Sequence, residues 1–170
     1  MALGGIWTLI GLVFFASGQG PYWMEPETMA MSMRDIKGIE LWVEETGPEG
    51  EQGFGKEEEL ASAATKRLMD AGIKILLSSD RASSDGNAAL HIHVIVVKAE
   101  ACNAYLVRYY AGVNQSVELR RNQEIRGYAV TWMTGGIGFY APDTVQAGIR
   151  DGVALLTGEF IKAYRLANRK

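Results

Sequence analysis

The two histidines of the chain, His91 and His93, are the residues whose type and spacing come nearest to a metal site. They stand two apart in an alternating run, so a β-strand would place both on one face, about 7 Å apart. Zinc sites need a third or fourth ligand, and Arg108 on the next expected strand would add a cation to that face. The pattern therefore favours two histidines on the uncovered sheet face and predicts no bound metal. A small-ligand or metal-binding module at His91 and His93 remains the alternative.

A second candidate is the glycine-rich stretch 136–141, which has the spacing G-x-G-x-x-A of a dinucleotide-binding turn. Such a turn opens a β-α-β unit, in which an acid about 20 residues later holds the ribose from the end of the second strand. Here one expected helix follows and then the carboxyl terminus, and Glu159, at the right distance, lies inside that helix. The stretch is therefore predicted to be a turn with glycine-only backbone geometry and no ligand.

Other reactive side chains give no catalytic arrangement. The carboxylates 44–45 and 57–59 are contiguous runs that flank a loop, and such runs are usually solvated or suit a helix amino-terminus. Two histidines in one strand cannot build a Ser-His-Asp triad, and Cys102, the only cysteine, falls in an expected hairpin turn. We therefore predict no catalytic residue and no cofactor, with an enzyme whose site the sequence does not reveal as a further possibility.

Charge and the amino-terminal segment indicate the compartment. Residues 1–60 contain eleven acids and three bases, and no Lys/Arg stripe follows, so nucleic acid is a poor partner. Residues 1–18 resemble an export signal, with an apolar run from Ile6 to Ala16 followed by small residues. The sequence predicts an exported, periplasmic protein, with membrane contact only if this segment is retained as an anchor.

Periodicity organises the rest of the chain. Residues 19–35 are expected to form an arm or linker, and residues 36–170 a single domain. We expect strands near 39–44, 73–77, 90–97, 105–120 and 125–134, and helices near 60–72 and 145–164. The order β-α-β-β-β-β-α predicts an α+β fold, a two-layer α/β sandwich. Its mixed, mostly antiparallel five-stranded sheet would carry both helices on one face.

Several sequence stretches resemble those of a known group of proteins. The acidic loop before the first helix, the strand AGIKIL, the hairpin ending at Trp132 and the closing helix with Ile-Arg-Asp-Gly-Val153 are similar to small exported bacterial proteins of unknown function. More distantly, the layout resembles the amino-terminal domain of TolB and the periplasmic domain of CsgG. The resemblance implies an envelope protein with a two-layer domain, and it supplies no catalytic residues.

The second sheet face is the expected functional surface. Strand 90–97 is apolar on both faces, and neighbouring strands are rich in aromatic residues. The second face would therefore expose more apolar surface than a monomer normally does. We therefore predict a non-enzymatic envelope protein that binds a protein partner or forms a homo-oligomer through this face. The expected contact residues are Ile95, Val97, Tyr105, Tyr109, Tyr128 and Trp132.

Overall fold

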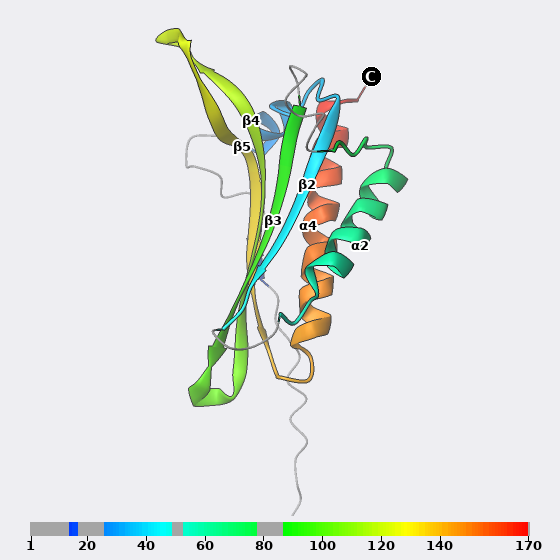
Figure 1. The fold of residues 1–170 in the computed structure, drawn as a ribbon, viewed down its shortest axis with the longest axis vertical. Helices are drawn as coiled ribbons and strands as arrows, with labels where there is room; N and C mark the ends of the chain where they lie inside the picture. The colour runs from blue at the N-terminus through cyan, green and yellow to red at the C-terminus, as the bar shows by residue number, and fades with distance from the viewer. Residues whose placement is uncertain (1–13, 17–25, 49–52, 78–86, 170) are drawn as a thin grey trace, which may run out of the picture.

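A mixed sheet with helices on one side forms the body of the molecule (Figure 1). The computed structural model describes residues 14–16, 26–48, 53–77 and 87–169. Their elements are β1 (Phe14–Ala16), α1 (Pro26–Met31), β2 (Gly38–Thr46), α2 (Glu57–Asp70), β3 (Asn87–Ala99), the 3-10 turn η1 (Glu100–Cys102), β4 (Ala104–Leu119), β5 (Asn122–Tyr140) and α4 (Val145–Ala167).

The strand order across the sheet is β1-β5-β4-β3-β2. β2 and β3 run parallel, and the chain between them passes through α2, whereas β3, β4 and β5 form an antiparallel meander. The predicted α+β class is confirmed, but the parallel partner of β2 is β3 and not the expected strand at 73–77.

The predicted strand at 73–77 is wrong. Instead of five long strands, the sheet has four, and this segment meets it through one bridge between Ile39 and Ile75. Its buried apolar residues, Ile73 and Leu76, are three apart, which is not the alternation of a strand. The three-residue β1 extends the sheet at the opposite edge, where it pairs with β5.

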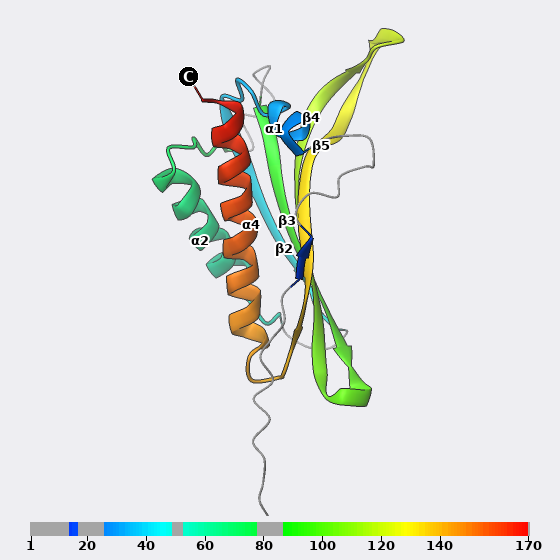
Figure 2. The same cartoon turned by 180° about the vertical axis from the view of Figure 1, so that it is seen from behind.

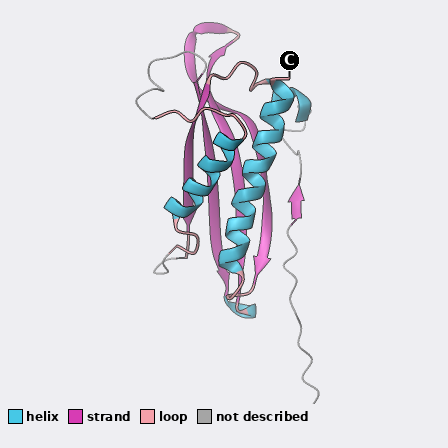
Figure 3. Cartoon of the chain, turned by 90° about the vertical axis from the view of Figure 1, so that its right-hand side faces the viewer, coloured by secondary structure: helices cyan, strands magenta, loops and turns pink. Residues whose placement is uncertain are grey.

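Helices α2 and α4 lie over one face of the sheet, which we call the covered face (Figures 2 and 3). As the 3.6-residue period predicts, α4 buries one side against the strands and α2 buries Leu60, Ala64 and Leu68. Gly72, with a φ of +81°, follows the end of α2, where glycine is the natural stop. The predicted inner positions of α4 are buried: Val145, Ile149, Val153, Leu156 and Phe160.

Close approach between α4 and the sheet depends on two glycines of the helix. A Cβ atom at Gly148 would collide with the ring of Tyr140, and one at Gly152 would collide with the ring of Tyr109. Both tyrosines are buried, and their hydroxyl oxygens lie 3.0 Å apart. The Tyr109 hydroxyl also donates to the Gly148 carbonyl at 2.9 Å.

The prediction of a turn at residues 136–141 is wrong, because β5 continues through this stretch to Tyr140. Among the described residues, Gly72 is the one glycine with a positive φ, so these glycines do not serve turn geometry. A Cβ at Gly135 would lie 2.6 Å from the carbonyl oxygen of Tyr109, and one at Gly138 would meet the Tyr140 ring. Gly135 therefore lets the β4 backbone approach closely, Gly138 gives room for the buried Tyr140 ring, and neither glycine ends a strand.

Two hairpins extend beyond the body at opposite ends of the sheet. The β3–β4 turn lies at one end and the long β4–β5 hairpin at the other, and both bend away from the helices (Figures 1 and 2). We call residues 116–130 the projecting hairpin, in which all residues except Val117 and Ala129 are exposed. The sheet face opposite the helices is therefore concave.

The amino-terminal elements lie at the β5 side of the sheet. Helix α1, from the expected arm, buries Met29 and Ala30 against the core, and Met33 after it is fully buried. Residues 1–13 of the expected signal segment and 17–25 of the segment and arm lie outside the described residues. No helix in the described ranges is long and apolar enough to cross a bilayer.

Candidate functional site

The sheet face opposite the helices, here called the open face, is built from alternate residues of four strands. Cross-strand pairing aligns Val97, Leu106 and Phe139 in one row and Ile95, Arg108 and Ile137 in the next. Their strand neighbours Val96 and Val107 point to the other side and are buried. Alternation therefore assigns the open-face residues to one surface without ambiguity.

Five apolar residues gather on this surface and form what we call the apolar band: Ile95, Val97, Leu106, Ile137 and Phe139. Val97 and Ile137 are each 52% exposed, and Leu106 and Phe139 are 39% and 38% exposed. An ordinary protein surface exposes single, scattered apolar side chains, whereas these five form a contiguous patch across three strands.

Arg108 lies in the middle of the apolar band. It is paired with Ile95 on one side and Ile137 on the other, and Leu106 and Tyr110 flank it along β4. Burial raises the pKa of the Tyr110 phenol, and the positive charge of Arg108 opposes this rise. The Tyr110 ring lies over Gly112, where a Cβ would collide with it. The band is thus an apolar surface with one cation at its centre and an aromatic ring at its border.

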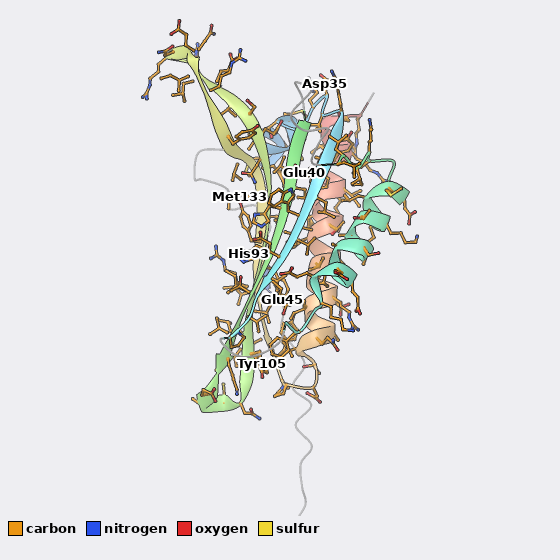
Figure 4. All side chains as sticks on the ribbon, in the orientation of Figure 1. Asp35, Glu40, Glu45, His93, Tyr105 and Met133 are labelled. Carbon is orange, nitrogen blue, oxygen red and sulfur yellow. The ribbon has the colours of Figure 1, made fainter. Side chains whose placement is uncertain are left out.

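A polar group occupies the open face next to the band. His91 and His93 stack with ring centroids 5.7 Å apart, as expected from their shared face (Figure 4). His91 Nε2 lies 3.0 Å from Glu44 Oε2, and His93 Nε2 lies 3.0 Å from Thr46 Oγ1. Each ring is therefore directed to a different residue of β2.

This arrangement does not bring metal ligands together. Within the part of the chain that the structure describes, no group of three or more His, Cys, Asp or Glu residues could hold a metal ion. Arg108 shares the face with the histidines, as the sequence predicted. No observation on these residues favours the metal-binding alternative.

The predicted contact residues divide between the two faces. Ile95 and Val97 lie on the open face, but the expectation that Tyr105, Tyr109 and Trp132 would join them is wrong. These three point to the helices and are buried, with Trp132 packed edge-on against Phe160 at 5.6 Å. They pair with covered-face residues or lie among them, so their rings belong to the core.

Tyr128 and Trp132 are an even number of residues apart, yet they lie on opposite sides. Trp132 pairs with Val113, whereas Val130 pairs with Asn114, so Thr131 is an extra residue in β5. Such a bulge reverses the alternation beyond it. Tyr128 therefore lies on the open-face side of the projecting hairpin, where it is 66% exposed.

Three band residues were missed by the sequence reading. Leu106, Ile137 and Phe139 lie on the open face, and the last two were assigned to a turn. Alternation of Ile137 and Phe139 with the small Gly136 and Gly138 was a strand signal. Met133 belongs to the same face and is labelled on that side in Figure 4.

The acidic residues near α2 have a structural role. The Glu45 carboxylate accepts the backbone N–H groups of Phe54 and Gly55 at 2.5 and 2.7 Å. Glu57 in turn accepts the backbone N–H of Glu45 at 3.0 Å. These bonds hold the loop that enters α2 against the end of β2, so this acidic group organises a loop.

Comparison with known proteins adds two similar structures. No family model matches the chain, and no curated protein matches it. A variant PelC dodecamer from Paraburkholderia phytofirmans is similar with a TM-score of 0.47 and 14% identity, over 89% of this chain and 98% of that one. A second PelC dodecamer from the same organism has a TM-score of 0.45 and 15% identity, over 95% of this chain and 100% of that one. Neither is a TolB or CsgG domain, so that resemblance stays a prediction.

Proposed function

We propose that this chain is a non-enzymatic protein of the cell envelope that binds another protein through its open sheet face. The observation that carries the proposal is the apolar band around Arg108, formed by three adjacent strands and uncovered by any described element. Protein interfaces concentrate apolar side chains and arginine at their centre, with polar groups around them. The band, with the His91–Glu44 and His93–Thr46 pairs at its border, has this composition.

The position of Arg108 favours a different protein over a second copy as the partner of the open face. In a two-fold dimer the same patch appears on both sides, so two stacked bands would bring their central arginines together. Two like charges removed from water repel one another strongly. The partner that fits is therefore another protein with an apolar surface that carries a carboxylate.

The concave shape of the open face supports the same conclusion. Both hairpins bend to the side of the band, so the surface partly encloses what it contacts (Figure 1). A convex element of the partner, such as a helix with one acidic residue among apolar ones, would meet both the band and Arg108. The envelope location of this binding follows from the signal-like segment 1–18 and is part of the proposal.

Site-specific photo-crosslinking in the envelope of the source cells tests the proposal. A photoreactive residue at Val97 of the full chain should crosslink to a protein other than itself, and Arg108→Glu should abolish the product. The control position is Leu155, an apolar residue 47% exposed on α4. Equal products from Val97 and Leu155, or a Val97 product that survives Arg108→Glu, would contradict the proposal. A product of the chain with itself would replace it by self-association.

A further inference from the structure

The long strands at the two sides of the sheet differ in how well they resist pairing with another chain. β2 on one side contains three glutamates, Glu40, Glu44 and Glu45, and is bridged by Ile75. Charged side chains on an edge strand discourage pairing with a further strand. On the other side, residues 132–140 of β5 contain no charged residue and no proline. The sequence of β5 therefore leaves this edge, here called the β5 edge, suited to a further strand.

The short strand β1 occupies part of the β5 edge. Its residues Phe14–Ala16 pair antiparallel with residues 135–137, and Phe14 stands opposite Ile137. Figure 2 shows β1, in dark blue, beside β5. Three paired residues allow only a few ladder hydrogen bonds, each with a modest net contribution to stability. The edge thus accepts an extended segment from elsewhere in the chain, and a longer strand could make more bonds there.

β1 lies inside residues 1–18, the segment that resembles an export signal. Removal of this segment would take β1 away, whereas α1 begins at Pro26 and would remain. The backbone N–H and C=O groups that now pair with β1 would then face water at residues 135–137. Export would therefore convert a paired edge into an open one.

The position of the β5 edge indicates which kind of strand fits it. Ile137 and Phe139 of the apolar band belong to β5, and they are 52% and 38% exposed. Residues of an added strand that stand opposite these two would lie on the open face, because alternate residues of paired strands share a face. A strand with apolar residues at those positions would cover Ile137 and extend the apolar band by one strand. Main-chain hydrogen bonds would supply affinity and these side chains specificity.

We propose that residues 135–140 form a strand-acceptor site, which β1 fills in the full chain. Removal of residues 1–18 opens this site to an extended segment of the protein that binds the open face. That segment runs antiparallel to β5, as β1 does, and has apolar residues opposite Ile137 and Phe139. The inference rests on the proposed function for export and for the partner, whereas the acceptor site itself rests on the pairing of β1 with β5.

A peptide-exchange experiment tests the acceptor site. A site for a sequence-specific protease is inserted between Gly18 and Gln19 of the full chain, and the folded protein is cut there. A fluorescent peptide of residues 8–17 with a lysine tail should bind the cut protein and bind the uncut chain about tenfold more weakly or less. The matched control peptide, with Phe14→Pro and Phe15→Pro, lacks two N–H donors and should also bind about tenfold more weakly. Fluorescence anisotropy measures binding, and circular dichroism confirms that the cut protein is folded.

A disulfide that holds β1 in place tests the partner. In a Cys102→Ser chain, Phe14→Cys with Ile137→Cys joins two residues that stand opposite each other. In the source cells this lock should abolish most of the crosslinked product from Val97, whereas Ile137→Cys alone, the matched control, should keep it.

The outcomes separate this inference from the proposed function. Equal binding of the peptide to cut and uncut chains, or equal binding of the proline peptide, would overturn the acceptor site and leave the Val97 product unaffected. An unchanged Val97 product in the locked chain would overturn the inference even where the peptide binds. Absence of a Val97 product from every chain would overturn the proposed function and with it the partner, while the peptide result would still decide whether the β5 edge accepts a strand.

Discussion

The covered and open faces of the sheet come from the same strands and differ in what alternate residues contact. On β4, Val107 and Tyr109 are buried under α4, while Leu106 and Arg108, which alternate with them, are exposed on the other side. The covered face contributes hydrophobic burial and close packing to the free energy of folding. The open face contributes little to it, and it is the surface to which we assign binding. Substitutions on the two faces should therefore separate stability from association.

The largest expected contrast is between two phenylalanines. Phe160 is fully buried on α4, so Phe160→Ala should lower the free energy of unfolding by about 3–5 kcal/mol. Phe139 is 38% exposed in the apolar band, so Phe139→Ala should lower the free energy of unfolding by less than about 1 kcal/mol. Urea unfolding followed by circular dichroism measures both. Equal costs would mean that the open face is buried in the isolated protein.

Two glycines of α4 give the next contrast. At Gly152 an added methyl group collides with the Tyr109 ring, so Gly152→Ala should destabilise the fold by about 1–3 kcal/mol. At Gly158 nothing lies within 4 Å of the added carbon, so Gly158→Ala should stabilise the helix by about 0.8–1 kcal/mol. Thermal unfolding of both variants checks the signs, and two stabilising substitutions would show that α4 does not need its close approach.

A smaller effect should depend on pH. Burial, and then the hydrogen bond with Tyr140, raise the pKa of the Tyr109 phenol far above its ordinary value of 10.0. The folded state therefore holds this proton more tightly than the unfolded state. Its contribution to stability is complete below about pH 10 and is lost as the pH rises above that value.

The variant Tyr109→Phe tests this dependence. At neutral pH it should cost about 1–2 kcal/mol, because the hydroxyl no longer donates to the buried Gly148 carbonyl. Above pH 10 the wild type should lose stability faster than the variant, so their unfolding midpoints converge. Tyr128→Phe removes an exposed hydroxyl and serves as the control. A constant difference between Tyr109→Phe and wild type at all pH values would contradict the assignment.

The smallest expected contrast lies between two neighbouring glutamates on opposite faces. Glu45 accepts two backbone N–H groups at the loop into α2, so Glu45→Gln should cost about 1–2 kcal/mol. Glu44, half exposed on the open face, pairs with His91, and Glu44→Gln should cost no more than about 0.5 kcal/mol. Chemical denaturation at pH 7 compares them, and a larger loss at Glu44 would assign a structural role to the polar group of the open face.

Much of the fold follows from local pattern. Alternation predicted β3 and β4, and the helical period predicted the buried sides of α2 and α4, because burial on one side leaves a periodic signal. The strand at 73–77 was predicted wrongly because a short apolar run has the same sequence pattern whether or not it pairs with a neighbouring strand along its length. Its single bridge at Ile75 depends on where α2 ends relative to β2, which is a tertiary property.

The candidate site was harder to predict, because it depends on register. Glycines at 135, 136 and 138 indicated a turn, but Gly135 lets the β4 backbone approach closely and Gly138 gives room for the Tyr140 ring. The bulge at Thr131 places Tyr128 and Trp132 on opposite faces of the sheet, and no local sequence pattern marks such an extra residue. The open-face position of Ile95 and Val97 was predicted correctly because strand β3 has no bulge between them and the buried Val94.

The parallel pairing of β2 with β3 has a consequence for the order of folding. The meander β3-β4-β5 joins neighbours in the sequence, so its loops close at a small entropic cost. Pairing β2 with β3 requires closure of the much longer segment that contains α2, and such distant contacts form more slowly. We therefore expect the meander with α4 to form the folding nucleus and β2 to join late. Substitutions at Ile39 should then accelerate unfolding, whereas those at Val107 should slow refolding.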